Sequence, residues 1–495
     1  MAYNLAKSLL FEFRHDENRY NLYIVTMTMK LADLINTDAR SGPRYRAIAD
    51  TIADAITSGA LSEGEKLPPM RELAFALSVT TGTVARAYAL AAARQHIASE
   101  VGRGSFVHLG PPHSRTALSA PGGQDAPDDG IIGMKANLPA EIGQTQRMAD
   151  ETAQMIAEGG AARFGYLPAG GAMHHREGGA AWIATGDYHP SADNILLCSG
   201  AQQAILGSIL AATEPGDLIL TESLTYHAIT AQALMLGRRV VPVEIDHEGL
   251  IPEALARACR GSRVTALFTV PTLHNPTTAT MSAARRAAIA EVAAAQQISV
   301  IEDDIYANLT PERPLPIAHL IPDQTYYINS LSKAVAPGLR VAYLVPPRDR
   351  YDRTRAIVHG LGQTLPPLMA DLATRIITNG TADALLAKQK TEIAARNAIA
   401  ARVFELTPRQ YNSAALHLWL ALPDHWRATA FAEAARLRGV AIATGEDFMV
   451  GHRDQASRHV RLCLGAATNR SKLEQGLTIL RDLMAETPIE TQALA

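Results

Sequence analysis

Hydrophobic residues recur along this chain in two patterns, and the change between them falls near residue 110. Before that point, residues 44–60 place Ile48, Ile52 and Ile56 on one face of an expected helix that ends at Gly59. After it, short β-rich runs alternate with helical patterns such as 282–297. The expected strands lie at 194–199, 217–222, 264–270, 298–304 and 341–345. This alternation predicts an α/β domain with a mostly parallel sheet.

The segment before the change has the pattern of a winged helix-turn-helix. A Pro-rich entry, GEKLPPMRELAFALSV, leads into a second helix, and Thr80 is suited to cap a third helix, TTGTVARAYALAAARQ. The glycine-flanked run VGRGSFVHL then resembles a β-wing. Such an arrangement places the N-terminus of a helix in the DNA major groove. The polar residues expected to face DNA are Arg71, Thr81, Thr83 and Arg86, with Arg103 at the wing.

Charge alone does not decide what this segment binds. Residues 41–108 contain seven Lys or Arg against six Asp or Glu, which is nearly neutral. A small helical domain used for dimerisation has the same composition, so that alternative stays open at this point.

A Pro- and Gly-rich stretch divides the chain. Residues 109–135 have few large apolar residues, which predicts a linker. The expected organisation is an N-terminal extension of unknown role at 1–40, the winged helix at 41–108, the linker, and an α/β domain at 136–495.

Composition excludes several classes of protein. The 495 residues are 47% hydrophobic and 19% charged with a net charge of −3, so the chain folds as more than one domain and is not globally basic. Three widely spaced cysteines exclude a disulfide framework and indicate a reducing cytoplasm. No apolar run approaches the roughly 18 residues of a membrane span. The histidines at 174–175 and 452 lack metal-ligand spacing, so no metal site is expected.

Lys333 lies between a buried-looking run, YYINS, and a Pro-Gly turn, which is unusual for a lysine. A lysine there can simply extend its amine to water. Other polar residues nevertheless follow expected strands: Asp303 in IEDDIY and Asn275 in HNPTT, while SGAQQAI opens a helix whose N–H groups suit an anion. Ser330 and Arg340 on either side of Lys333 suit a phosphate.

These residues together fit pyridoxal phosphate chemistry. Lys333 would form a Schiff base with the aldehyde, and the Asp303 carboxylate would keep the pyridine nitrogen protonated. Tyr306 and Asn275 are placed to bond the ring oxygen, and Tyr226 to stack on the ring.

The same motifs resemble fold-type-I aminotransferases of class I/II over roughly 136–485. They are SGAQQ, TYHAI, HNPTT, DDIY, SLSKAVAPGLR and VRLCLG, in that order. The resemblance assigns the phosphate to Ala201, Gln202, Ser330 and Arg340, and makes Arg461 the ligand of a substrate α-carboxylate. It also makes Tyr166, in RFGYLPAGG, the residue that reaches the phosphate in a partner subunit, which implies a homodimer.

LPPMRELA, VTTGTVARAY and GRGSFV resemble the DNA-binding domain of GntR-type regulators, although Thr81 replaces the common arginine of the recognition helix. A winged helix joined to an aminotransferase-like domain is the layout of the MocR subgroup. The implied function is a regulator that binds operator DNA and senses pyridoxal 5′-phosphate or its adduct with a small amino compound. The alternative is a working aminotransferase with a fused winged helix.

Overall fold

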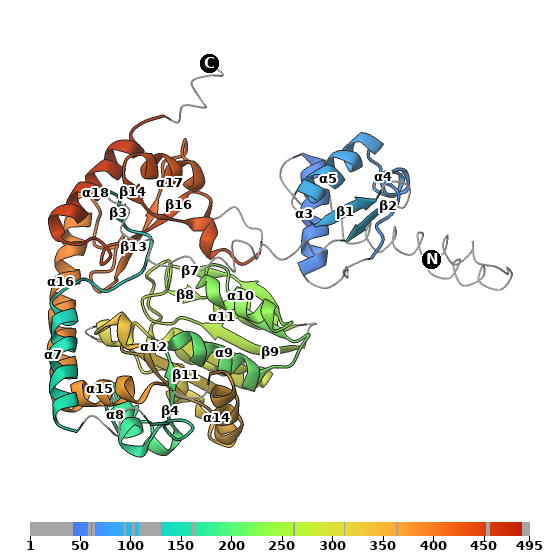
Figure 1. Ribbon diagram of the computed structural model, residues 1–495. Coiled ribbons are helices and arrows are strands. Elements are labelled where there is room, and N and C mark those ends of the chain that lie inside the picture. The colour runs from blue at the N-terminus through green and yellow to red at the C-terminus, as the bar shows by residue number, and fades with distance from the viewer. Residues whose placement is uncertain are drawn as a thin grey trace. The chain divides into compact units, whose positions relative to one another are not determined.

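The computed structural model describes residues 43–57, 61, 65–93, 96–100, 104–107, 130–159, 165–260, 263–310, 312–362, 365–451 and 456–487. The chain divides into two compact units, Met1–Thr116 and Ala117–Ala495 (Figure 1). The expected N-terminal extension at 1–40 lies outside the described residues, as does most of the expected linker.

In the part of the smaller unit that the structure describes, three helices accompany a two-stranded antiparallel sheet. The helices are α3 (Arg44–Thr57), α4 (Met70–Ala76) and α5 (Thr81–Ala93), and the strands are β1 (Ile97–Glu100) and β2 (Gly104–Val107). A single bridge from Lys66 to Phe106 adds the chain before α4 to the edge of β2. This is the predicted order of helix, turn, recognition helix and wing.

Apolar residues on the inner faces of the three helices hold this unit together. Ile48 and Ile52 of α3 pack with Leu73 of α4 and Val84 of α5, all fully buried. The Tyr88 hydroxyl donates to the Pro68 carbonyl over 2.9 Å, which fixes α5 to the Pro-rich entry of α4. At the start of α5, Thr80 Oγ1 accepts from the Thr83 N–H at 3.2 Å, as the capping prediction requires.

The larger unit is built on a seven-stranded sheet in the order β4-β12-β11-β10-β9-β5-β6. Within this sheet only β12 is antiparallel to its neighbours, so the expected mostly parallel sheet is confirmed. The strands are β4 (Leu196–Ser199), β5 (Leu218–Glu222), β6 (Arg239–Val243), β9 (Val264–Thr269), β10 (Ser299–Asp303), β11 (Thr325–Ser330) and β12 (Val341–Val345).

Both faces of this sheet are covered, which explains the continuous apolar runs of its strands. Along β12, Ala342 and Leu344 enter one hydrophobic cluster and Val341 and Tyr343 another. The first cluster includes α9 (Ala201–Ala212), and the second includes α8 (Met173–Ile183) and α15 (Pro367–Thr378). The remaining helices around the sheet are α10 (His227–Met235), α11 (Pro252–Ala258), α12 (Ala283–Gln296), α13 (Ile317–Leu320) and α14 (Tyr351–Gly360).

A smaller antiparallel sheet is formed by β13 (His417–Ala421), β16 (His459–Cys463) and β15 (Ala443–Thr444). The helix α17 (Ala428–Leu437) contacts β15 and β16, and α18 (Arg470–Met484) contacts α17. The 23-residue helix α16 (Thr381–Val403) contacts both α15 and α18, and so runs from one sheet region to the other (Figure 1). The helix α7 (Gln144–Ala157) contacts α15.

The expected linker extended too far at its C-terminal end. Ile132–Gly133 form the strand β3, which pairs in parallel with β14 (Val440–Ala441). Ile132 and Met134 are buried in the core of the small-sheet region, so residues 130–135 belong to the folded unit. The Gly-rich composition of this stretch is typical of a loop, but its apolar side chains pack into the core.

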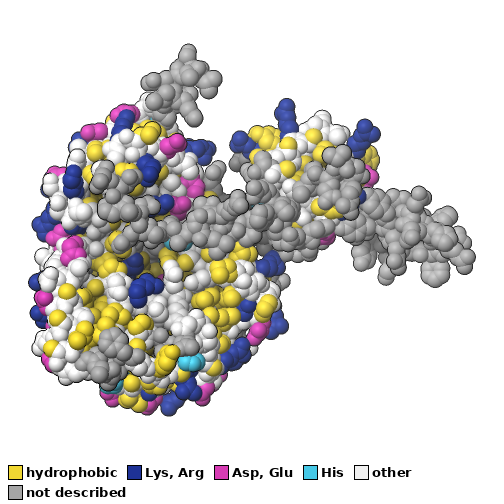
Figure 2. Space-filling view, viewed as in Figure 1, with side chains coloured by type: hydrophobic (Ala, Val, Ile, Leu, Met, Phe, Trp, Pro, Cys, Tyr) yellow, Lys and Arg dark blue, Asp and Glu magenta, His cyan; other side chains and the backbone are white. Residues whose placement is uncertain are grey.

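Lys and Arg side chains are interspersed with Asp and Glu over the visible face of the larger unit, in line with the near-zero net charge (Figure 2). Among the described residues no single helix has both the length and the apolarity to cross a membrane, and the sharply bent pair α4–α5 meets that test only when its two helices are taken together.

Candidate functional site

A cavity of about 240 Å³ lies where the strands of the large sheet end. Asp303 is the last residue of β10 and Ser330 the last of β11, while Ala201 opens α9 directly after β4. Parallel strands bring their carboxyl ends to one edge of a sheet, which is where polar loop residues converge. Ten of the eleven pocket residues expected from the sequence line this cavity: Ala201, Gln202, Tyr226, Asn275, Asp303, Tyr306, Ser330, Lys333, Arg340 and Arg461.

Lys333 follows β11 and extends its amine into the cavity, where Nζ donates to the Asn137 carbonyl. Burial, together with the nearby positive charge of Arg461, lowers the pKa of this lysine to about 8. A lysine with this pKa is partly unprotonated at neutral pH, and the unprotonated amine is the nucleophile. The pocket around Lys333 therefore favours the neutral form of its amine.

Asp303 is 2% exposed, and its Oδ1 has no hydrogen-bond partner among the described residues. Burial, together with the negative charge of Asp304, raises the pKa of this carboxyl to about 7. A buried carboxylate oxygen without a partner is costly. A positively charged N–H donor placed in the cavity would satisfy it.

Part of the cavity lining is suited to an anion. Ala201, the first residue of α9, lines the cavity together with Arg340, so a helix N-terminus and a guanidinium both border it. Gly200 has φ +83°, and a Cβ there would lie 2.6 Å from Arg340 Nη2. Any other residue at this position would therefore clash with the Arg340 guanidinium where it now lies. Ser332 also lines the cavity, and its N–H donates to Ser330 Oγ at 3.1 Å.

Arg461 of β16 approaches from the small sheet. Its Nη1 donates to Asn275 Oδ1 at 2.7 Å, and its Nη2 to the Lys135 carbonyl at 2.8 Å. The guanidinium carbon lies 4.5 Å from the Phe448 ring centroid, while Nε is buried without a hydrogen-bond partner among the described residues. A buried guanidinium with donor capacity left over is suited to a carboxylate.

A hydrogen-bonded network that the sequence did not reveal joins these groups. Asn137 Nδ2 donates to the Tyr306 hydroxyl at 2.9 Å and lies 3.2 Å from His417 Nδ1, while His417 Nε2 lies 3.0 Å from the Pro276 carbonyl. Burial holds the pKa of His417 well below its ordinary value. The neutral ring therefore accepts at Nδ1 and donates at Nε2, and it links the loop after β9 to β13.

Sequence reasoning missed Ser332, Asn137 and His417. Ser332 had a local signal, because it stands one residue before Lys333 in SLSK. Asn137 and His417 had none, since they meet across 280 positions of sequence.

Two kinds of expected residue lie away from the cavity. Tyr166 is 90% exposed and does not line it within this chain. In the smaller unit, Arg71 of α4 and Thr81 and Arg86 of α5 are exposed, whereas Thr83 is half-buried with its hydroxyl 2.9 Å from that of Thr80. Arg103 lies outside the described residues. The DNA contacts of these residues stay predictions.

Comparison with known proteins identifies the family. A model of "Aminotransferase class I and II" matches residues 130–480, and one of "Bacterial regulatory proteins, gntR family" matches residues 44–107. The chain is 31% identical over 448 residues to the uncharacterized HTH-type transcriptional regulator YdeF of Bacillus subtilis (strain 168), covering 90% of this chain and 96% of that protein. The chain belongs to the MocR subgroup of GntR-type transcriptional regulators.

Further similarities support this MocR-type organisation. The vitamin B6 salvage pathway transcriptional repressor PtsJ of Salmonella typhimurium is 30% identical over 83% of this chain and 92% of its own. The aminotransferase fold is shared with the α-aminoadipate aminotransferase LysN of Thermus thermophilus, with a TM-score of 0.66, 22% identity and coverage of 74% of this chain and 94% of that one. The expected fold class is thus confirmed for both parts of the chain.

The cavity fits pyridoxal 5′-phosphate. When bound, this cofactor supplies an aldehyde and a ring that withdraws electrons when its nitrogen is protonated. The unpartnered oxygen of Asp303 matches the ring N–H, and the N-terminus of α9 with Arg340 matches the phosphate. Asn275 and Tyr306 line the same cavity and would donate to a ring oxygen, and Lys333 lines it as well.

Lys333→Ala is expected to prevent covalent capture of the cofactor. Wild-type protein mixed with pyridoxal phosphate should turn yellow, and reduction with borohydride followed by peptide mapping should place the label on Lys333. The variant should stay colourless, because it lacks the amine that forms the Schiff base. Lys333 is the cavity lysine expected to do so, since its charge is near enough to Asp303 to affect the pKa of that carboxyl. Lys135→Ala, at the other lysine that lines the cavity, is the control and should still turn yellow. A label on another lysine would refute the assignment.

The rate of capture is expected to depend on the lowered pKa of Lys333. Because only the unprotonated amine attacks, the rate should rise with pH. The midpoint of this rise should lie at pH about 8, well below the ordinary lysine pKa of 10.5. Arg461→Met removes one cause of the shift and should move the midpoint to higher pH, whereas Arg353→Met, at an exposed arginine on α14, should leave it in place. Stopped-flow absorbance across this range measures the midpoint. A wild-type midpoint near the ordinary value would contradict the buried environment.

Proposed function

We propose that this protein is a transcriptional regulator that binds operator DNA through its winged helix and senses pyridoxal 5′-phosphate, or an amino compound captured on it, in the cavity at Lys333. The observation that carries the proposal is that one chain joins a GntR-type winged helix to an aminotransferase-type domain whose cavity is lined by ten of the eleven expected pocket residues. The vitamin B6 salvage repressor among its relatives supports a signal of this chemistry.

Arg461 is proposed to recognise the carboxylate of an amino-acid effector. Its guanidinium is buried, aimed into the cavity, and retains unused donor capacity at Nε. A bidentate contact with a carboxylate would orient the effector amine toward the centre where Lys333 acts. That contact would compete with the present hydrogen bond from Arg461 to Asn275, and so would alter how the small sheet is held against the large one.

We also propose that the protein acts as a homodimer. Tyr166 is 90% exposed on a single chain, and a dimer gives this tyrosine a partner pocket to enter. Operator half-sites would then be read by two winged helices.

The competing function is a working aminotransferase. It is favoured by the same cavity, because Lys333, Asp303 and Arg461 are also what transamination needs. Coupling to DNA separates the two functions, since a sensor requires that effector binding change operator affinity.

Operator binding should depend on Arg71 and Arg86. Each substitution to alanine should weaken binding to a selected operator by about 1–3 kcal/mol if the guanidinium contacts a base. Affinity should also fall steeply with salt, because phosphate contacts release counterions. Arg402→Ala, which removes the same charge from an exposed site on α16, should have no effect. Selection from random duplexes supplies the operator, and failure to enrich any sequence would count against the regulator.

Arg461→Ala should abolish the response to amino acids, so that operator affinity is the same with and without effector. Candidate amino acids are titrated while absorbance and operator affinity are followed together. Arg458→Ala, at an exposed arginine directly before β16, should respond like wild type. Rapid product formation with constant operator affinity would instead establish the aminotransferase.

A further inference from the structure

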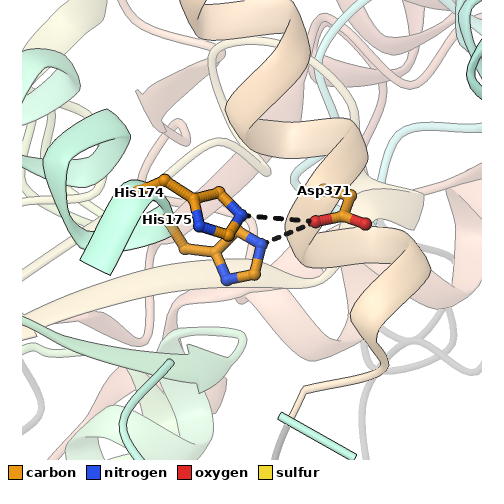
Figure 3. A group of neighbouring side chains, drawn as sticks. All are labelled: His174, His175 and Asp371. Carbon is orange, nitrogen blue, oxygen red and sulfur yellow. Dashed lines mark hydrogen bonds and ion pairs between the residues drawn. The ribbon is translucent and has the colours of Figure 1, made fainter. Parts of the chain in front are cut away.

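Two adjacent histidines and an aspartate from a distant part of the chain converge outside the cofactor cavity. His174 and His175 lie in the first turn of α8, and Asp371 lies on α15 (Figure 3). His175 Nε2 is 2.7 Å from Asp371 Oδ1, and His174 Nε2 is 3.6 Å from the same oxygen. One potential ligand atom of each residue lies within 4.8 Å of the other two.

An interhelical hydrogen bond accounts for only half of this arrangement. Neighbouring residues of a helix point about 100° apart, so two adjacent rings do not normally face one atom. His175 is buried and hydrogen-bonded to Asp371. His174 is 61% exposed and too far for a hydrogen bond, yet its ring leans on His175 with centroids 3.9 Å apart and directs Nε2 to the same oxygen.

We propose that His174, His175 and Asp371 bind a divalent transition-metal ion of the zinc type. Two imidazole nitrogens and a carboxylate oxygen are borderline ligands that suit zinc and cobalt and discriminate against magnesium. Tetrahedral bonds of about 2.0–2.1 Å place neighbouring ligand atoms about 3.3 Å apart. The 3.6 Å from His174 to Asp371 is already near this value, and the His175–Asp371 pair must open by about 0.6 Å.

The exposure of the site agrees with this assignment. The partial exposure of His174 and Asp371 leaves a path for the ion and room for water to complete its coordination. Among the described residues His175 Nδ1 has no hydrogen-bond acceptor, so the outer support typical of tight sites is missing and moderate affinity is expected.

A bound ion would join the first turn of α8 to α15. That turn directly follows residues 165–172, which include Tyr166. Because the ion binds only where the two helices are packed, it should raise the thermal stability of the larger unit, and the gain should grow with the logarithm of the free ion concentration above the dissociation constant.

The test uses the full-length, untagged protein after metals have been removed with a chelator. Every sample contains the same amount of pyridoxal phosphate per chain. Cobalt is titrated while its visible absorption is followed, and zinc binding is measured by competition with cobalt. Magnesium serves as the negative control. Wild type should take up one cobalt ion per chain with tetrahedral absorption. His174→Ala and Asp371→Asn should each weaken binding by at least about tenfold, and His359→Ala, at an exposed histidine of α14, should not.

His174→Ala decides the matter, because its exposed side chain can be removed without loss of core packing. Circular dichroism and thermal melts without metal check that each variant is folded. Absence of saturable cobalt uptake by wild type, or undiminished uptake by folded His174→Ala, would overturn the proposal and leave an ordinary hydrogen bond between His175 and Asp371.

Discussion

The placement of Lys333, Asp303 and Arg461 in one small cavity is the constraint on which the rest of the structure depends. Asp303 and Arg461 are buried, and Lys333 is half-buried. Charged groups removed from water need partners or must change their protonation state. Here the carboxyl has its pKa raised to about 7 and the amine has its pKa lowered to about 8, so both are poised near neutrality. A ligand with a protonated ring nitrogen and an anionic group supplies what the cavity lacks, which is why the pocket is suited to the cofactor.

The cavity also requires that the two sheets of the larger unit stay together. Asp303 and Ser330 end strands of the large sheet, whereas Arg461 and His417 belong to the small one. Their contacts with Asn275 and Pro276 cross the boundary between the sheets. A carboxylate bound at Arg461 would act on one of these contacts, which is the route we propose for an effector to change the arrangement of the unit.

The same side chains serve a sensor and an enzyme equally well, because capture of an amino compound is the first event in both. The difference lies in where the binding free energy is used. A catalyst uses it on the transition state, whereas a regulator uses it to shift an equilibrium that alters DNA affinity. The winged helix, with its exposed Arg71 and Arg86, is the part of this chain through which such a shift would change DNA binding.

The amino-acid sequence was enough to predict the order of elements, the family and ten of the residues that line the cavity. Apolar periodicity indicated the strands, and Asp303, Asn275 and Lys333 were found because parallel strands bring the residues that follow them to one edge. The folded structure was needed to show that residues 130–135 belong to the fold, that Asn137 and His417 tie the pocket together, and that Asp371 faces His174 and His175. These pairs are separated by hundreds of positions, and no local pattern encodes a contact whose geometry arises from the packing of whole helices and sheets.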